Sequence, residues 1–534
     1  MTDGLVVRGA SVADGTGAPA YAADVTVSGG RIAAIAPPGE GGPGRSLDAH
    51  GLVLAPGFVD MHAHSDLALL SDPGHLAKVG QGVTCEVLGQ DGLSYAPVDD
   101  TTLAQLRRQL AGWNGDPEGF DWDWRSVGEY LARLDRGIAV NACYLVPQGT
   151  VRAVAMGWDA RPPTEAELER QKTLVAEAMA EGAIGMSSGL TYTPGMYAGT
   201  DELVELCRVV ARLGGYYSPH HRSYGAGALE AYAEMVEVSR ASGCPLHLAH
   251  ATMNFAVNAG RAGELLRLLD TAIDGGCDIT LDTYPYLPGS TTLAALLPSW
   301  ASEGGPDHTL ARLRDPATAE RVRRVMEEDG SDGCHGVPVD WDTIQISGTR
   351  SPALAGRVGR TIARLAADSG RAPFEVYREQ LLDDELGTTI LQLVGNEENV
   401  RAIMRHPAHT CGSDGLLTGA RPHPRAWGSF PRYLGHYARA EGVLTLEECV
   451  AHLTGNAARR LRLVERGLVR PGYHADLVLF DPLTVGDAAT FDDPRRQPTG
   501  IPYVFVGGVP VIADGRPTGA LPGRALRHTP TGTR

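Results

Sequence analysis

Apolar, strand-like runs alternate with amphipathic helical segments through the middle of this chain, and each run ends in a polar side chain. Such β/α alternation predicts a parallel sheet, and the simplest closed form is a (β/α)8 TIM-like barrel of the α/β class. The polar ends should then meet at one rim, because active sites of such barrels lie at the carboxyl ends of the strands. The runs and their end residues are 82–89 with Asp91, 139–146 with Gln148, 215–219 with His220, 245–249 with His250, 278–281 with Asp282, and 410–413 with Asp414.

Short strands at both chain ends predict a second, smaller unit. The N-terminal strands are expected at 5–12, 24–28 and 31–35, and the C-terminal ones at 475–480 and 502–512, with glycine turns between them. We expect a small β-sandwich domain formed from residues 1–54 and 465–534, and a barrel over 55–464. Helical segments within about 290–405 exceed an ordinary βα loop and predict an insertion subdomain.

Composition narrows the class of protein. A chain of 534 residues with 43% hydrophobic and 21% charged residues is ordinary for an enzyme with a large core. A net charge of −17 argues against a nucleic-acid partner, and we expect no membrane partner because neither a signal peptide nor a long apolar run is visible. Eight scattered cysteines without a C-x-x-C pair predict a reduced, cytoplasmic protein, either a monomer or a small homo-oligomer.

The segment 57–66 carries the first candidate metal ligands. If 58–64 forms a strand, then Asp60, His62 and His64 share one face. Two imidazoles on one face can reach one cation, although two hydrogen-bonded core histidines would give the same pattern. The ligands at the other strand ends favour the metal interpretation.

A catalytic zinc ion uses about three protein ligands and keeps one position open. We predict that His220, His250 and Asp91 hold the principal ion, and that His62 and His64 define an adjacent position. An aspartate in a Gly-bounded turn can instead cap its own backbone, which is the alternative for Asp91. His221 and His247 have the wrong strand parity and are expected to be supporting or packing residues.

Asp414 is the predicted general base. A carboxylate opposite the metal can take a proton from the attacking water and deliver it to a leaving nitrogen. Taken alone, Ser413-Asp414-Gly415 would indicate only a tight turn. Its position beside two histidine clusters favours the catalytic role.

The Pro-Gly-Phe-Val-Asp-x-His-x-His segment resembles the metal-dependent amidohydrolase superfamily. Within it, 182–195 and 427–432 are similar to the N-acyl-D-amino-acid deacylases (D-aminoacylases), and the resemblance runs from about residue 4 to 527. It implies hydrolysis of the amide bond of a small-molecule N-acyl-D-amino acid, with substrate contacts from Tyr192, Arg222, Tyr284 and Ser290. It also implies Zn2+, with one tightly bound ion and room for a second.

The chain departs from the family at several positions. Gln90-Asp91-Gly92 stands where the family has Asn-Cys-Gly, so a carboxylate replaces a thiolate, and this harder ligand admits Mn2+ or Fe2+. A family lysine linked to the substrate carboxylate is Thr252 here, and a family histidine is Gln148. These changes leave the reaction class intact but bear on the substrate's side chain and chirality.

Three other functions fit parts of the sequence. A cyclic-amide hydrolase resembling hydantoinases or dihydropyrimidinases could use the same barrel. Those enzymes carry a lysine that bridges two metals, but the candidate strand 143–147 has no lysine, and the chain has only two, Lys78 and Lys172. Gly185-x-Ser187-x-Gly189 matches a serine nucleophile elbow, but the segment that follows does not read as a helix. A non-catalytic binding barrel is the third alternative, and the full set of ligands speaks against it.

Overall fold

The computed structural model describes residues 4–529, so the outermost residues of both predicted terminal segments (1–3 and 530–534) lie outside the described part. Its centre is an eight-stranded parallel sheet in the order β16-β12-β11-β10-β9-β8-β7-β6. The two edge strands meet, because the amide of Met61 donates to the Cys411 carbonyl (3.1 Å) and Ala63 bridges Gly415. This near-closed barrel confirms the predicted α/β barrel fold. The strands are β6 (Phe58–Asp60), β7 (Val83–Leu88), β8 (Asn141–Pro147), β9 (Gly185–Gly189), β10 (Tyr216–His220), β11 (Leu246–Leu248), β12 (Ile279–Thr283) and β16 (His409–Cys411).

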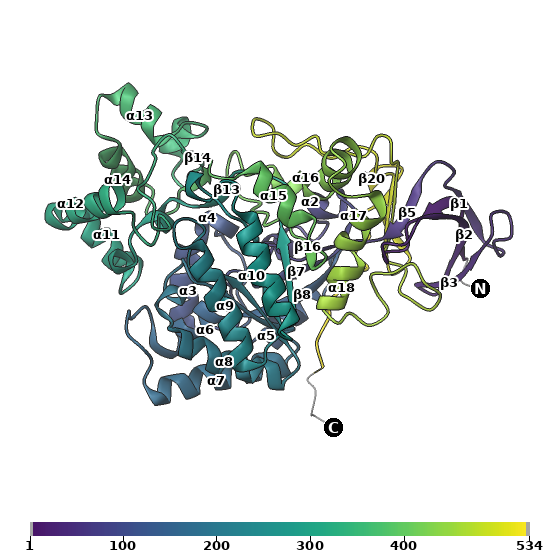
Figure 1. The fold of residues 1–534 in the computed structure, drawn as a ribbon, viewed down its shortest axis with the longest axis horizontal. Coiled ribbons are helices and arrows are strands. Elements are labelled where there is room, and N and C mark those ends of the chain that lie inside the picture. Colours follow the sequence, from purple (N-terminus) through teal and green to yellow (C-terminus); the bar gives the residue numbers. More distant parts are fainter. Residues whose placement is uncertain (1–3, 530–534) are drawn as a thin grey trace.

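Helices follow the strands and cover the outside of the barrel (Figure 1). Because the barrel is filled inside and covered outside, its strands are buried on both faces, and every residue of β7 and β8 is buried. The helices are α1 (Ala68–Ser71), α2 (Leu76–Val79), α3 (Asp100–Gln109), α4 (Ala111–Asn114), α5 (Val127–Leu134), α6 (Gln148–Met156), α7 (Glu165–Ala180), α8 (Thr200–Arg212), α9 (Ala228–Ser242), α10 (Ala262–Asp274), α15 (Glu397–Met404), α16 (Arg425–Arg432), α17 (Leu446–Leu453) and α18 (Gly455–Arg460).

Both chain ends build one nine-stranded sheet. Antiparallel pairing of β5 with β17, with Leu54 opposite Leu479, joins the N-terminal strands to the C-terminal ones. Leu54, Leu479 and Phe505 share one apolar core with strands β1 and β2. The strands are β1 (Leu5–Val12), β2 (Tyr21–Ser28), β3 (Arg31–Ala36), β4 (Arg45–Asp48), β5 (Val53–Pro56), β17 (Leu477–Phe480), β18 (Tyr503–Val506), β19 (Val509–Ala513) and β20 (Arg516–Pro517).

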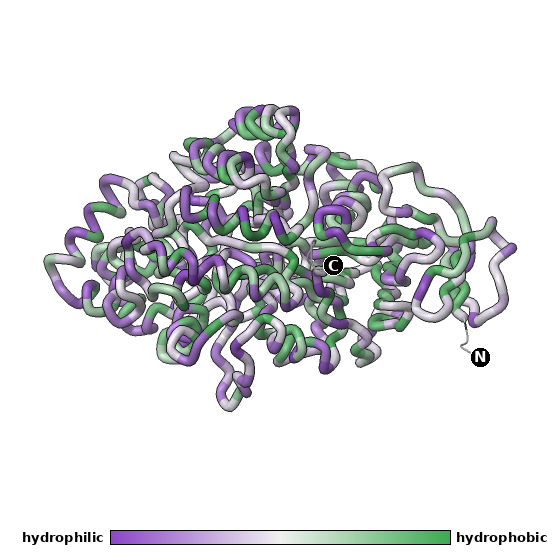
Figure 2. Tube along the Cα trace, turned by 90° about the horizontal axis from the view of Figure 1, so that it is seen from below, coloured by the Kyte–Doolittle hydropathy of each residue, from purple (hydrophilic) through white to green (hydrophobic). Residues whose placement is uncertain are grey.

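Between β12 and β16 the chain forms a layer of its own. A three-stranded antiparallel sheet, β13-β15-β14, packs with helices around a separate apolar core that includes Tyr377 and Trp341. This layer and the terminal sheet extend from opposite sides of the barrel (Figure 1), and Figure 2 shows the same elongated shape from below. Its elements are β13 (Gly289–Thr292), α11 (Pro306–Arg314), α12 (Pro316–Arg324), β14 (Ile344–Gly348), α13 (Ile362–Ser369), α14 (Pro373–Asp383) and β15 (Thr389–Gln392). The domain boundaries themselves stay a prediction.

One expectation about the barrel strands is corrected. The strand expected over 58–64 ends at Asp60, so His62 and His64 lie on the bend that follows β6 rather than within it. Within residues 4–529, no helix combines the length and the apolar character that crossing a bilayer requires.

Candidate metal centre

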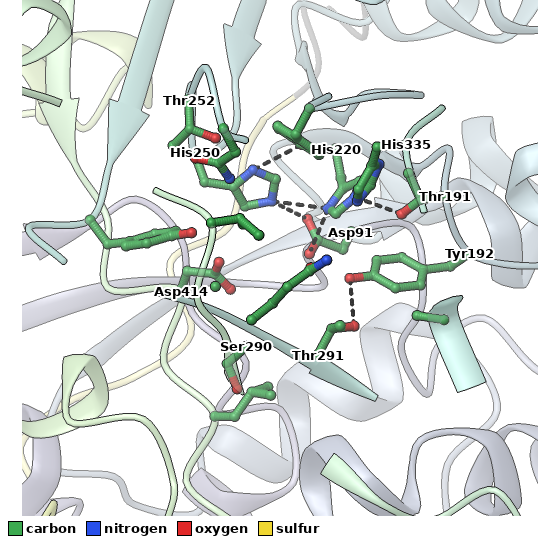
Figure 3. A pocket seen from close by; sticks show the side chains of 18 of the residues that line it. Asp91, Thr191, Tyr192, His220, His250, Thr252, Ser290, Thr291, His335 and Asp414 are labelled. Atoms are coloured by element: carbon green, nitrogen blue, oxygen red, sulfur yellow. Dashed lines mark hydrogen bonds and ion pairs between the residues drawn. The ribbon is translucent and has the colours of Figure 1, made fainter. Parts of the chain in front are cut away.

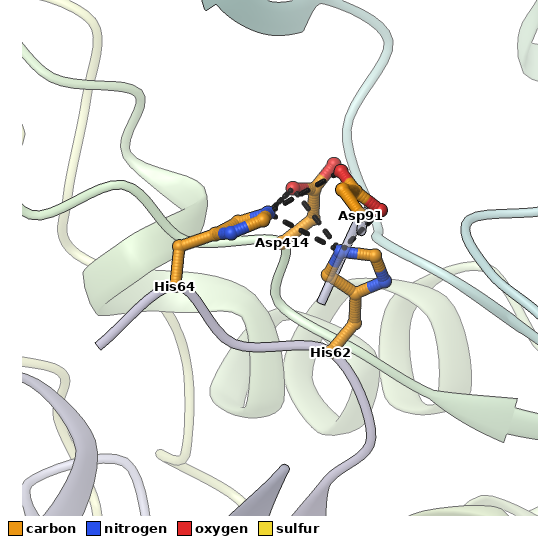
Figure 4. Close-up of side chains that lie close together, drawn as sticks. All are labelled: His62, His64, Asp91 and Asp414. Atoms are coloured by element: carbon orange, nitrogen blue, oxygen red, sulfur yellow. Dashed lines mark hydrogen bonds and ion pairs between the residues drawn. The ribbon is translucent and has the colours of Figure 1, made fainter. Parts of the chain in front are cut away.

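Two groups of potential metal ligands meet at the carboxyl ends of the barrel strands. The first comprises His62, His64, Asp91 and Asp414, whose ligand atoms all lie within 4.8 Å of one another (Figure 4). The Nε2 atoms of His62 and His64 are 3.3 Å apart. The Asp91 carboxylate lies 3.4 Å from the first of these nitrogens and 3.5 Å from the second.

The second group comprises Asp91, His220 and His250. Nδ1 of His220 and Nε2 of His250 face each other at 3.1 Å, and each lies 3.4 Å from an oxygen of Asp91 (Figure 3). Asp91 is therefore common to both groups. One carboxylate with two oxygens can serve two neighbouring ions, one on each side.

These donors fit divalent metal ions. The Oδ1 atom of Asp91 is buried and has no hydrogen-bond donor among the described residues, which is rare for a buried polar atom. Converging imidazole nitrogens and a carboxylate at these separations are the donor set that zinc and similar ions use. Burial by itself would raise the pKa of the Asp91 carboxyl, but His62, His220 and His250 outweigh it and hold that pKa well below its ordinary value. Asp91 is thus ionised, as a ligand must be.

The backbone at Asp91 is held in an unusual conformation. Its φ of 54° lies in the left-handed region, and His250 (33°) and Asp414 (49°) share that feature, so three of the six predicted ligands and bases sit in backbone conformations that non-glycine residues rarely adopt. A Cβ on Gly92 would lie 2.5 Å from the Gly189 nitrogen, so only glycine lets the Asp91 turn approach β9 this closely. The contact therefore requires glycine at position 92.

Ser187 supports that turn and is not placed to act as a nucleophile. Its Oγ accepts from the Gly92 amide (3.0 Å) and donates to the Gly89 carbonyl (2.5 Å). The side chain is buried and does not line the pocket, and no helix follows directly, because the next α-helix begins at Thr200. The geometry is therefore against the serine-hydrolase alternative.

Asp414 faces the first ligand group and is paired with a buried arginine. Its Oδ1 lies 3.2 Å from Nε2 of His64, and its Oδ2 lies 2.9 Å from Nη1 of Arg425. Burial would raise the pKa of the Asp414 carboxyl, but the Arg425 guanidinium and the neighbouring imidazoles hold it below its ordinary value. The carboxylate is ionised and can accept a proton.

A buried polar network ties β6 to the end of β16 beneath the ligands. The ammonium of Lys78 contacts Oδ2 of Asp60 (2.5 Å) and Oγ of Ser413 (2.6 Å). The other Asp60 oxygen accepts from the amides of Ser413 (2.8 Å) and His62 (3.2 Å). Asp60 thus points away from the metal ligands and holds the two backbone segments that carry His62 and Asp414.

The second ring nitrogen of each candidate ligand, His220 and His250, contacts a hydroxyl group. Oγ1 of Thr191 lies 2.7 Å from Nε2 of His220, and the Tyr224 hydroxyl lies 2.9 Å from Nδ1 of His250. Such partners orient a metal-binding imidazole and fix its tautomer. His247, which the sequence assigned a supporting role, contacts Asp282 at 2.9 Å, and Asp282 accepts from the His250 amide.

The two ligand groups open into a pocket between the barrel and the insertion layer. Three of the four predicted substrate contacts, Tyr192, Tyr284 and Ser290, line it. Arg222 does not, because its guanidinium binds Glu234 of α9 (2.8 Å) and two backbone carbonyls. The expectation that Arg222 contacts substrate is therefore not favoured by its geometry.

Two pocket residues were missed by sequence reasoning. Arg425 is the one lysine or arginine among the described lining residues, and it sits at the start of α16 rather than at a strand end. His335 reaches the pocket from the insertion layer, where burial lowers its pKa to about 3 and keeps it neutral. The stretch His423-Pro424-Arg425, just before the recognised 427–432 segment, was the available signal for Arg425.

The amidohydrolase family model (Amidohydro_3) matches residues 45–512 of this chain. The chain belongs to the amidohydrolase family. Amidohydrolases of this kind include the D-aminoacylase of Alcaligenes xylosoxydans xylosoxydans, to which the chain is 35% identical over 98% of both sequences. This amidohydrolase is thus a hydrolase that acts on carbon–nitrogen bonds other than peptide bonds.

Solved structures extend the likeness to the whole fold. A D-aminoacylase described as having a binuclear metal center matches with a TM-score of 0.83 and 34% identity, over 99% of this chain and all of the other. An N-acyl-D-glutamate deacylase from Bordetella bronchiseptica, complexed with zinc and a phosphonate inhibitor, matches with a TM-score of 0.84 and 33% identity, with the same coverage. A D-hydantoinase shares the fold alone, with a TM-score of 0.55 and 14% identity.

Proposed function

We propose that this amidohydrolase cleaves the amide bond of N-acyl-D-amino acids and releases a carboxylate and a free amine. The observation that carries the proposal is the position of the ionised Asp414. It lies in one ligand group with Asp91, and it is paired with Arg425, which lines the pocket. Full-length likeness to D-aminoacylase and to N-acyl-D-glutamate deacylase supports this substrate class. A cytoplasmic location is also proposed, in keeping with eight free cysteines.

The metal roles follow from the two groups. Asp91, His220 and His250 would hold the principal ion, and His62 and His64 with Asp91 would hold a second one. We propose Zn2+ for the principal position, with Mn2+ or Fe2+ admitted because the shared ligand is a carboxylate. A bound metal polarises the amide carbonyl and makes water a better nucleophile near neutral pH.

The chain's own residues then supply the proton transfers and the orientation. Asp414 accepts a proton from the attacking water at Oδ1 and passes it to the leaving nitrogen. Arg425 holds the other Asp414 oxygen and keeps the carboxylate aimed at the ligands. Neither lysine can bridge two metals as in carbamyl-lysine enzymes, because Lys78 is bound beneath the site to Asp60 and Lys172 pairs with Glu169 on α7.

Arg425 is also the group placed to bind the substrate carboxylate. Its Nε is buried without a hydrogen-bond partner among the described residues, and its guanidinium stacks 4.4 Å from the centre of the Tyr284 ring. A guanidinium with a spare donor suits a carboxylate. We propose that Arg425, Tyr284 and Ser290 form the carboxylate end of the pocket, in place of the family lysine that is Thr252 here.

The proposed function is tested by release of methionine from N-acetyl-D-methionine and N-acetyl-L-methionine and, as a control, by ring opening of 5-benzylhydantoin to its N-carbamoyl amino acid. We expect hydrolysis of the D-enantiomer, well above that of the L-enantiomer, and no activity on the hydantoin. The assay is run on zinc-loaded enzyme. Preference for the L-enantiomer, or activity on the hydantoin alone, would overturn the proposal.

The role of Arg425 predicts a substrate-dependent loss in Arg425→Gln. The value of kcat/KM for N-acetyl-D-methionine should fall about 10–100-fold further than that for N-acetyl-D-methioninamide, because a charged hydrogen bond contributes about 1.5–3 kcal/mol. If the substitution also disturbs Asp414, kcat/KM falls equally for both substrates. The ratio of the two values therefore reports the loss of carboxylate binding alone. Arg421→Gln, an exposed arginine of the same loop, is the matched control. Equal losses on both substrates would mean that Arg425 acts on Asp414 only.

A further inference from the structure

A second cavity lies behind Tyr192. It lies between the barrel and the insertion layer, and it shares Thr191, Tyr192 and Ala295 with the metal pocket. The Tyr192 hydroxyl is fixed by Oγ1 of Thr291 at 3.0 Å (Figure 3). The two cavities therefore meet along one wall, with the ligands on one side and the second cavity on the other.

The wall of the second cavity combines a cluster of apolar side chains with polar ones. Its apolar side chains include Trp158, Met196, Ala294, Leu297, Pro306 and Leu386. Several of its polar groups are already satisfied by protein partners. The Trp158 indole donates to Gln109 (3.1 Å), and the Gln109 amide donates to the Thr193 carbonyl (2.7 Å). Arg108 at the mouth is paired with Asp307 at 2.8 Å.

The polar and apolar sides of the site are on opposite flanks. Asp414 lies on one flank of the ligands and Tyr192 on the other (Figure 3). Arg425, the proposed carboxylate group, is on the Asp414 flank because it binds that residue directly. In an N-acyl amino acid the carboxylate and the acyl chain leave the amide in opposite directions. If the carboxylate binds Arg425, the acyl chain points toward Thr191 and Tyr192.

We propose that the second cavity is the binding site for an aliphatic acyl chain, so that the preferred substrates carry medium-length acyl groups rather than acetyl. The proposal rests on the proposed function, whose substrate class it narrows. The apolar part of this wall would bind a hydrocarbon chain by the area that the chain removes from water. The chain would run along Ala295 and Tyr192 into the space between Met196 and Leu297.

The test compares N-octanoyl-D-methionine with N-acetyl-D-methionine in the zinc-loaded full-length enzyme. The wild type should hydrolyse the octanoyl substrate with the higher kcat/KM. Ala294→Trp, which fills the second cavity from the insertion layer, should lower kcat/KM for the octanoyl substrate about 10–200-fold and change that for the acetyl substrate less than about 3-fold. Met196→Trp fills the cavity from the barrel side, and it provides an independent test if the first variant misfolds. Val257→Trp, at an exposed position in the loop after β11, is the control and should change neither value.

The outcomes separate the two proposals. Hydrolysis of the acetyl substrate with no octanoyl activity in the wild type, or equal losses on both substrates in both filled variants, would overturn the acyl site and leave the proposed function standing. Failure of the wild type on every N-acyl-D-amino acid tested would overturn the proposed function and the acyl site with it. Selective loss of the octanoyl substrate in both variants supports the acyl site.

Discussion

Asp414→Asn should reduce kcat about 10²–10⁴-fold while the protein keeps the metal held by Asp91, His220 and His250, because the amide cannot accept the proton that general-base catalysis requires. The change is isosteric and leaves the second ligand group untouched. Asp414 also belongs to the first ligand group, so at most one equivalent of metal should be lost. Turnover of N-acetyl-D-methionine and metal content are measured on the same preparations.

The control for Asp414→Asn is Asp492→Asn, which changes an exposed carboxylate paired with Arg421 and should leave both quantities at their wild-type values. Retention of more than about a tenth of the wild-type kcat would contradict the general-base role, since such groups contribute at least about 10²-fold. Loss of all metal would instead make Asp414 an essential ligand.

Lys78→Met should lower the free energy of unfolding of the metal-free protein by about 3–5 kcal/mol, because removing one partner of a buried ion pair leaves the other charge uncompensated. Lys78 and Asp60 are both fully buried, and Glu86 lies 3.9 Å from the same ammonium. Burial alone would raise the pKa of the Glu86 carboxyl, but the neighbouring His75 and Lys78 outweigh burial and lower that pKa. Lys78 is thus the direct partner of Asp60, whereas Glu86 also has His75 at 3.1 Å. Urea denaturation followed by circular dichroism gives the measurement.

Lys172→Met offers a matched control, because it removes the chain's other lysine from the surface of α7, where it pairs with Glu169. Its effect should stay within about 0.5 kcal/mol. The double variant Lys78→Met with Asp60→Asn should be less destabilised than the sum of the two single variants. Equal effects of the two lysine variants would contradict the view that Lys78 ties β6 to β16.

The sequence predicted the barrel and the clustering of most candidate ligands because both depend on local pattern. A parallel strand places its last residues at a common rim, so His220, His250 and Asp414 could be brought together by topology alone. Capping boxes at Thr164 and Thr445 likewise depend only on residues three apart, and both are present at the starts of α7 and α17. Sequence patterns are sufficient where a single strand or helix determines the position of a side chain.

What the sequence did not predict depends on contacts between distant segments. Asp91 lies between the two ligand groups because its turn is held against β9 by Ser187, which is about a hundred residues away in the sequence. Arg425 was missed because it enters the pocket from a helix start. Arg222 was expected in the pocket because the family resemblance implied a substrate contact, but the chain turns it toward Glu234 of α9.

The most direct test of the account is the number of zinc ions bound per chain, measured by elemental analysis after dialysis against excess zinc and removal of free metal. With Asp91 shared by both ligand groups, the wild type should bind two equivalents, His64→Ala should keep about one, and Asp91→Ala should fall well below one. Asp91→Ala with wild-type zinc content would contradict the shared-ligand centre and leave Asp91 as a turn residue.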